Sequence, residues 1–224
     1  MKIKYLLYIT LITLFASCKK DNYDAPNISL NGRVVYKGVP INVEQTYENT
    51  SIIELWQPGF GKIAPINTAI AQDGSYSQML FKGNYKLTMR DGNGPWMWRR
   101  NTAGRPDTVF VNLQGDQSLD LEVTPYYMIR NSKFAINSRN INANFDLEKV
   151  ITDAANGKNI ESVTLYINKT QFVSASSSIA NASLNTVTNF SNISLNVAIP
   201  ALIPTQNYVF ARIAVKIAGV GRLL

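Results

Sequence analysis

The sequence contains no histidine and a single cysteine, Cys18. Without histidine, the chain cannot form a Ser-His-Asp or Cys-His nucleophilic site or a His-ligated metal site. One cysteine excludes an intrachain disulfide framework and a cysteine-rich zinc module. The remaining function classes are binding, scaffolding and carboxylate-based catalysis. We expect no bound metal ion and no other cofactor.

Charge is also sparse. The 224 residues include 22 basic and 15 acidic side chains, and the basic ones are scattered. After the N-terminal segment, the only adjacent basic pairs are Lys19-Lys20 and Arg99-Arg100. Proteins that bind phosphate backbones concentrate lysine and arginine on one face, so we expect no nucleic-acid partner. The chain is 46% apolar, which argues against disorder.

The N-terminus has the pattern of a bacterial lipoprotein signal. Lys2 and Lys4 precede an apolar run over residues 5–16, which is too short to span a membrane. The run ends at Leu14-Phe15-Ala16-Ser17-Cys18, which looks like a lipobox. We predict a signal peptide over residues 1–17 and a tether over residues 18–27 with acyl chains on Cys18. Several chains on one residue anchor a soluble protein firmly, so the lipid is the expected membrane contact. The alternative is an ordinary signal peptide followed by a chance cysteine.

The rest of the chain shows the period-2 alternation of half-buried strands, and no long helical stripe. Clear examples are residues 85–90, 109–113, 163–168 and 193–199. Glycine-rich turn signals separate these runs. The predicted fold is therefore all-β, with two consecutive β-sandwich domains. Proline cannot donate to a strand ladder, so we place the domain boundary at Thr124-Pro125, giving domains over residues 28–124 and 125–224.

The first half carries motifs of a known sandwich family. The most telling are the turn Asp73-Gly74-Ser75-Tyr76 and the strand entry Gly83-Asn84-Tyr85-Lys86-Leu87. Together with Leu30-Asn31-Gly32-Arg33-Val34 and Gly38-Val39-Pro40-Ile41, they resemble the transthyretin-like, carboxypeptidase-regulatory-like β-sandwich.

The second half ends in a segment, residues 202–213, that is similar to a stretch near the end of fibronectin-III and immunoglobulin-like sandwiches. That resemblance implies that Tyr208 packs as a corner residue. It also implies a further strand after Gly219. The C-terminal sandwich either lacks this last strand or begins it at residues 222–224.

Lipobox, tether, transthyretin-like domain and immunoglobulin-like domain together resemble the two-domain surface lipoproteins of unknown function in Bacteroidota. Genes for that group commonly lie beside those for SusC-like transporters and SusD-like glycan-binding proteins. The resemblance implies binding or handling of polysaccharide at the outer membrane, facing the cell exterior, with SusC/SusD-like partners. It implies no catalytic residue.

A glycan site needs exposed flat aromatic faces with polar side chains nearby. Trp96 and Trp98 follow a glycine-rich turn and would share one face of an extended segment. We predict that they form a stacking platform, with Trp56, Arg99 and Asn101 as helpers. The alternative is that the tryptophans fill the end of the sandwich or the domain interface.

Two other functions stay open at this point. One is a structural or interaction module that supports an outer-membrane transporter complex, which buried tryptophans would favour. The other is a glycan-active enzyme, which needs two carboxylates at a defined spacing across a cleft. The acids do not suggest such a pair: Asp73, Asp91, Asp107 and Asp116 all lie in turn contexts, and Asp120 and Glu122 share an outer strand face.

Overall fold

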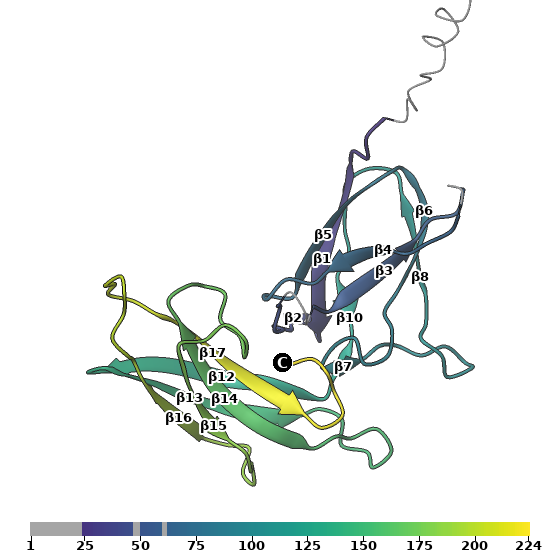
Figure 1. Cartoon of the computed structure of the whole chain (residues 1–224). Helices are drawn as coiled ribbons and strands as arrows, with labels where there is room; N and C mark the ends of the chain where they lie inside the picture. The colour runs from purple at the N-terminus through teal and green to yellow at the C-terminus, as the bar shows by residue number, and fades with distance from the viewer. Residues whose placement is uncertain (1–23, 47–49, 60–61) are drawn as a thin grey trace, which may run out of the picture.

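A computed structural model describes residues 24–46, 50–59 and 62–224 (Figure 1). The predicted signal peptide and Cys18 lie outside these residues. None of the residues described forms a helix, and so none provides a helix that could cross a membrane. The prediction of an all-β chain with two sandwich domains is confirmed.

The N-terminal domain consists of two sheets and a short ribbon that leads to the second domain. In the first sheet, β1 (Ile28–Tyr36) pairs antiparallel with β2 (Val39–Pro40) and β5 (Ser75–Leu80), and parallel with β9 (Gln117–Ser118) and β10 (Leu121–Glu122). The second sheet has the order β4 (Ile66–Ala69), β3 (Ile52–Trp56), β6 (Gly83–Thr88), β8 (Val109–Leu113). The ribbon pairs β7 (Trp96–Met97) with β11 (Thr124–Pro125).

The core between these sheets follows the alternation seen in the sequence. On β6, Tyr85 and Leu87 are fully buried while Lys86 between them is exposed. On β1, Leu30 and Val34 face them from the other sheet. Burying such side chains gives about 1.5–3 kcal/mol each, which is why the apolar phase of each strand selects the inner face.

Three carboxylates satisfy backbone donors along β1 where the short strands β9 and β10 leave gaps. These carboxylates stabilise β1 by accepting hydrogen bonds from its backbone. Asp120 and Glu122 each bind a different N–H group of the strand. The bonds run from the Ser29 N–H to Asp116 Oδ1 (2.8 Å), from the Arg33 N–H to Asp120 Oδ1 (2.9 Å) and from the Lys37 N–H to Glu122 Oε1 (2.5 Å).

The C-terminal domain is a sandwich of two three-stranded sheets. One has the order β12 (Tyr127–Asn137), β13 (Asn140–Lys149), β16 (Ile193–Ala198), and the other has the order β15 (Ala180–Leu184), β14 (Ile160–Asn168), β17 (Phe210–Ile217). All pairings are antiparallel. Phe145 and Leu165 are buried between the sheets. The edge strands are β12 and β16 in one sheet and β15 and β17 in the other, and none of them has a second neighbouring strand among the residues described.

The end of the chain touches that edge of β17. The Val215 N–H donates to the Leu224 carbonyl (3.1 Å), and the Leu224 N–H donates back to the Val215 carbonyl (3.3 Å). Residues 222–224 therefore begin an antiparallel pairing with β17, but among the described residues no strand continues it.

Direct contacts join the two domains. The Tyr126 N–H donates to the Pro95 carbonyl (3.0 Å), next to the β7–β11 ribbon. On the other side, Glu44 is buried, its N–H donates to the Leu223 carbonyl (3.1 Å), and its Oε1 accepts the Ala175 N–H (2.6 Å). Figure 1 shows the C-terminus lying between the domains.

We predict that Gly32→Ala destabilises the N-terminal domain by about 2 kcal/mol. A Cβ at Gly32 would lie 2.0 Å from the Leu119 carbonyl oxygen, which is backbone and cannot rotate away. Gly115 is the matched control, because a Cβ there meets nothing within 4 Å. Urea unfolding measures both variants. Equal stability of the two would contradict the packing of β1 against the segment at Leu119.

We also predict that Asp146→Asn lowers stability at neutral pH and that the difference from the native protein shrinks in acid. Hydrogen bonds from the Asn131 side chain (2.8 Å) and the Asn192 N–H (2.8 Å) stabilise the charged form and lower the pKa of Asp146 below its usual 3.8. A lowered folded-state pKa adds stability above the unfolded-state pKa, and this is lost as pH falls through the folded-state value. Thermal unfolding between neutral pH and pH of about 3 tests this. A difference that does not change with pH would refute it.

Candidate functional site

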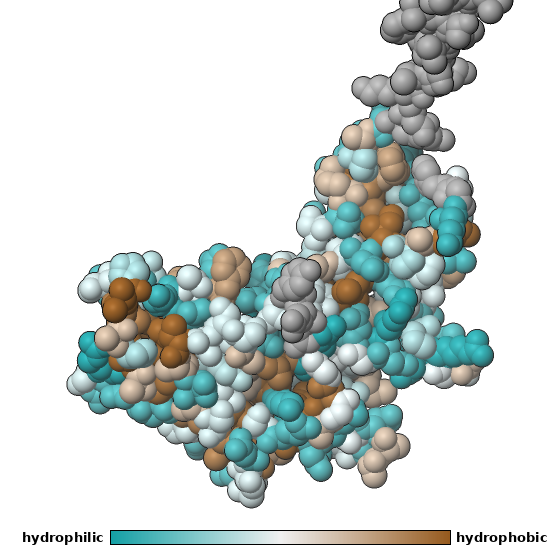
Figure 2. All heavy atoms as spheres, in the orientation of Figure 1, coloured by the Kyte–Doolittle hydropathy of each residue, from teal (hydrophilic) through white to brown (hydrophobic). Residues whose placement is uncertain are grey.

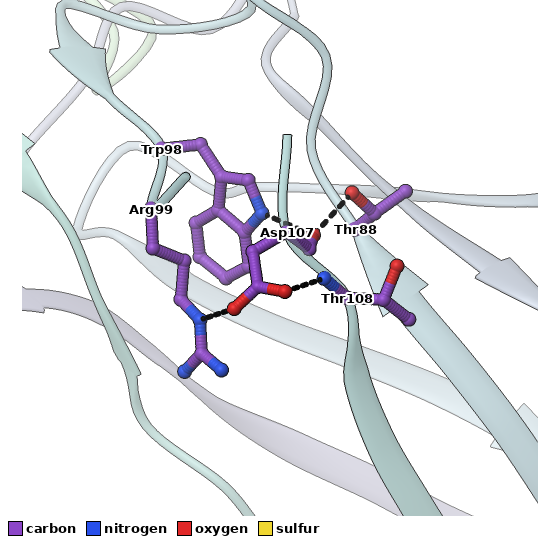
Figure 3. A network of polar contacts seen from close by, with 5 residues as sticks. All are labelled: Thr88, Trp98, Arg99, Asp107 and Thr108. Atoms are coloured by element: carbon purple, nitrogen blue, oxygen red, sulfur yellow. Dashed lines mark hydrogen bonds and ion pairs between the residues drawn. The ribbon is translucent and has the colours of Figure 1, made fainter. Parts of the chain in front are cut away.

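The two tryptophans of the predicted platform are buried. Trp96 on β7 and Trp98 just after it each expose only 3% of their surface. The Trp98 indole N–H donates to the Asp107 carbonyl (2.8 Å), which also accepts the Thr88 hydroxyl (2.8 Å), as Figure 3 shows. Trp96 packs so closely on Gly94 that a Cβ there would lie 2.2 Å from its ring.

The prediction of an exposed Trp96–Trp98 stacking platform is therefore corrected. Their ring faces lie in the core cluster and are not open to a ligand. The physical reason is the size of the indole, since burying its apolar area stabilises the domain more than exposure allows, and Asp107 satisfies the one polar group of Trp98. Trp96 and Trp98 instead pack inside the core of the sandwich.

The three helper residues do not converge on a common surface with the tryptophans. Arg99 is exposed, and its Nε donates to Asp107 Oδ2 (3.0 Å) while its guanidinium lies 5.8 Å from the centre of the Trp98 ring (Figure 3). Asn101 is exposed, but its Oδ1 accepts the N–H groups of residues 103 and 105 and so shapes its own loop. Trp56 is half-buried at the end of β3, opposite Lys86.

Asp107 is held in its charged form by this network. The Thr108 N–H donates to its Oδ1 (2.8 Å), and this bond, followed by the bond from Arg99, lowers the pKa of the Asp107 carboxyl. The loop that the sequence singled out is thus a packed and hydrogen-bonded connection that fixes Trp98.

The acids of the enzyme alternative make hydrogen bonds or ion pairs in the same way. The described residues contain no group of three or more histidine, cysteine or acidic residues that could hold a metal ion. The bonds are Asp73 with the Ser75 hydroxyl (2.6 Å), Asp91 with Arg100 (2.8 Å), Asp107 with Arg99 (3.0 Å) and Asp116 with the Ser29 N–H (2.8 Å).

An exposed aromatic residue does occur, but in the C-terminal domain. Tyr208 precedes β17 and exposes 56% of its surface, which contradicts the expectation that it packs as a corner residue. Its ring meets that of Phe210 edge to face, with the centroids 5.7 Å apart and an angle of 88°. This contact fixes the ring orientation and leaves a face for a ligand.

Polar side chains surround Tyr208 in a hollow of about 420 Å³. Asn207 is exposed, and Arg139, Thr205 and Gln206 form part of the wall. Ile136 and Leu202 also line the hollow. Figure 2 shows a brown, apolar area at this end of the lower domain, over the segment between β16 and β17.

Hydrogen bonds pin the segment that carries Tyr208. Arg139 donates to the carbonyls of Ile199 (3.2 Å) and Pro200 (2.8 Å). Gln206 Nε2 donates to the carbonyls of Lys169 (3.1 Å) and Tyr208 (2.7 Å). A loop held by a rigid sandwich in this way can present side chains without a large ordering cost on binding.

The sequence held a signal for this site. The alternation of the last long strand places residues 209, 211, 213, 215 and 217 inward, and so Tyr208 and Phe210 outward. The resemblance to a corner motif implies the opposite, a packed Tyr208, and so conflicts with the alternation that places both aromatic residues outward.

Comparison with known proteins identifies the family. The family described as "Protein of unknown function (DUF3823) N-terminal domain" matches residues 28–124, and the "Domain of unknown function (DUF3823_C)" matches residues 127–224. No curated protein is significantly similar to the chain.

Solved structures share the whole two-domain fold. A DUF3823 family protein from Parabacteroides merdae is 34% identical, with a TM-score of 0.75 over 89% of this chain and 96% of that one. One from Bacteroides ovatus is 31% identical, with a TM-score of 0.74 over 88% and 94%. A third structure, described as a "putative carbohydrate binding protein" from Bacteroides uniformis, is 19% identical, with a TM-score of 0.66 over 89% and 97%. The two matched domains and the close relatives together show that the chain belongs to the DUF3823 family.

Proposed function

We propose that this protein is a non-catalytic glycan-binding or accessory protein of a polysaccharide uptake system, and that it binds its glycan at Tyr208. The main support for this proposal is the exposed ring of Tyr208. It lies on a segment fixed by hydrogen bonds, beside amide, hydroxyl and guanidinium groups. An aromatic face matches the C–H face of a sugar ring, and the polar groups match its hydroxyls. Pockets of this kind combine an apolar surface with a few polar groups that fix orientation.

Two further points support the proposal. The Bacteroides uniformis structure of the same fold is described as a carbohydrate binding protein in the words quoted above. The lipobox places the expected lipid on Cys18, at the start of the tether, which would hold the domains at the outer membrane. SusC/SusD-like proteins are the partners that the family resemblance suggests, with the protein facing the cell exterior.

A structural or interaction module remains the second candidate function. The burial of Trp96 and Trp98 favours it, because the most aromatic loop of the N-terminal domain serves packing. On this alternative, the protein would stabilise a transporter complex and show no affinity for sugars.

Affinity electrophoresis of residues 19–224 against a panel of polysaccharides tests the first candidate. We expect retardation by at least one polysaccharide, and a loss of about tenfold in affinity for Tyr208→Ala, since the stacking face is removed.

Phe110→Ala is the matched control, because Phe110 is 75% exposed on β8 of the other domain and lies away from the proposed site. Its retardation should equal that of the native protein. Equal loss in both variants would remove Tyr208 as the site. No retardation of the folded native protein by any polysaccharide would favour the interaction module.

A further inference from the structure

A small polar pocket lies at the junction of the two domains, beside β7 (Figure 1). Its volume is about 200 Å³. The N-terminal domain lines it with residues between 91 and 100, and the other wall comes from Tyr126 and the loop at residues 155–158. The pocket shares no lining residue with the hollow at Tyr208, and residues 222–224 do not line it.

Four polar groups of the lining residues have no hydrogen-bond or ion-pair partner within the described part of the chain. They are the indole N–H of Trp96, the hydroxyl of Tyr126, the side-chain carbonyl of Asn156 and the ammonium of Lys158. Trp96 exposes only 3% of its surface, and a buried indole N–H normally has a hydrogen-bond partner. A ligand with acceptor oxygens would supply that partner from within the pocket.

The pocket carries one excess positive charge. Asp91 and Arg100 neutralise each other, because two nitrogen–oxygen contacts of 2.8 Å join their side chains. Lys158 has no such counter-charge, and its Nζ lies 5.5 Å from the centre of the Tyr126 ring. Since Arg100 already occupies Asp91, the pocket offers no free carboxylate to an ammonium group, which argues against an amino acid as the ligand. The remaining charge favours a ligand with one negative charge.

The polar groups of the pocket are held in place before any ligand binds. The Tyr127 hydroxyl donates to the Lys158 carbonyl (2.8 Å). Asn156 donates through its N–H and its Nδ2 to Asp153 Oδ1 (2.9 Å each), and its own side-chain carbonyl is left to accept. Burial is the main cause that raises the pKa of the Tyr126 hydroxyl above its usual 10.0, so this hydroxyl keeps its proton at neutral pH and can donate.

We propose that this pocket binds a single sugar unit that carries one negative charge, as a carboxylate or as a sulfate ester. Lys158 would pair with the charged group, since charge-assisted hydrogen bonds are the strong ones. Trp96 would donate through its N–H edge, because its ring face is covered, and Tyr126 and Asn156 would bind sugar hydroxyls. At about 30 Å³ per water the pocket has the volume of about seven waters, which suits one sugar ring and not a length of polymer. The site does not depend on glycan binding at Tyr208.

Titration of residues 19–224 with methyl glucuronide, followed by NMR, tests the proposal. The chain has three tryptophans, so each indole N–H signal can be assigned and followed by itself. We expect the Trp96 signal to shift and the Trp98 signal to stay, because the Asp107 carbonyl already binds the Trp98 N–H. Methyl glucoside, which lacks the charge, should bind about tenfold more weakly. A sulfated methyl glucoside is the second charged probe, and the tighter of the two identifies the group that the pocket prefers.

Two variants and a matched control localise the binding. Lys158→Met removes the charge and keeps an unbranched side chain, and it should weaken glucuronide binding about tenfold. Tyr126→Phe removes a hydroxyl that bonds to no described residue, so the fold should be unaffected while binding weakens about fivefold. Lys133 is exposed on β12 and outside the pocket, so Lys133→Met should bind like the native protein. Tyr208→Ala should also leave this binding unchanged, which separates this site from the proposed glycan site.

Four outcomes would overturn the proposal. The first is a Trp96 signal that neither charged sugar shifts, and the second is methyl glucoside that binds as tightly as the glucuronide. The third is sodium acetate that binds as tightly as the glucuronide, which would make this a site for a bare anion. The fourth is native affinity in both Lys158→Met and Tyr126→Phe, which would place the binding elsewhere.

Discussion

The contact between facing sheets, made by alternate side chains of each strand, determines where every other feature of this protein lies. A strand can give only one of its two faces to the sandwich, so residues of the other phase must be polar or must meet another surface. Lys86 and Phe110 are outward residues in the N-terminal domain, and Tyr208 is one in the C-terminal domain. The exposed aromatic residues are therefore informative, because the sandwich itself gives no reason for them to be there.

The same contact explains why the tryptophans are not a ligand platform. β7 is a two-residue strand that pairs with β11, next to the junction of the domains. A short ribbon at the end of a sandwich leaves a gap between the sheets, and a large ring fills it. Trp98 then needs a partner for its indole N–H, and the Asp107 carbonyl provides it within the same loop. Arg99 and Asn101 stabilise this loop from the outside.

The fold was predictable from the sequence because alternation is a local property, and strands such as residues 83–88, 109–113 and 193–198 follow it closely. The candidate site was not predictable in the same way, because the burial of Trp96 depends on the pairing of β7 with β11, a segment far along the chain. The outward position of Tyr208 could be predicted from the sequence, because the alternation over residues 209–217 places the odd-numbered residues inward and the even-numbered ones outward. Which strands form the edges of the two C-terminal sheets depends on strand order, which alternation does not specify.

Glu44 determines where the C-terminal domain lies relative to the tether. Hydrogen bonds of Glu44 with Leu223 and Ala175 hold the C-terminal domain against the end of the N-terminal domain that lies away from the tether (Figure 1). The C-terminal domain, which carries Tyr208, therefore lies beyond the N-terminal domain as seen from the tether (Figure 1). If the protein binds a glycan at Tyr208 as proposed, the glycan would be held by the domain that lies away from the tether, at a distance from the tether that the length of the N-terminal domain sets.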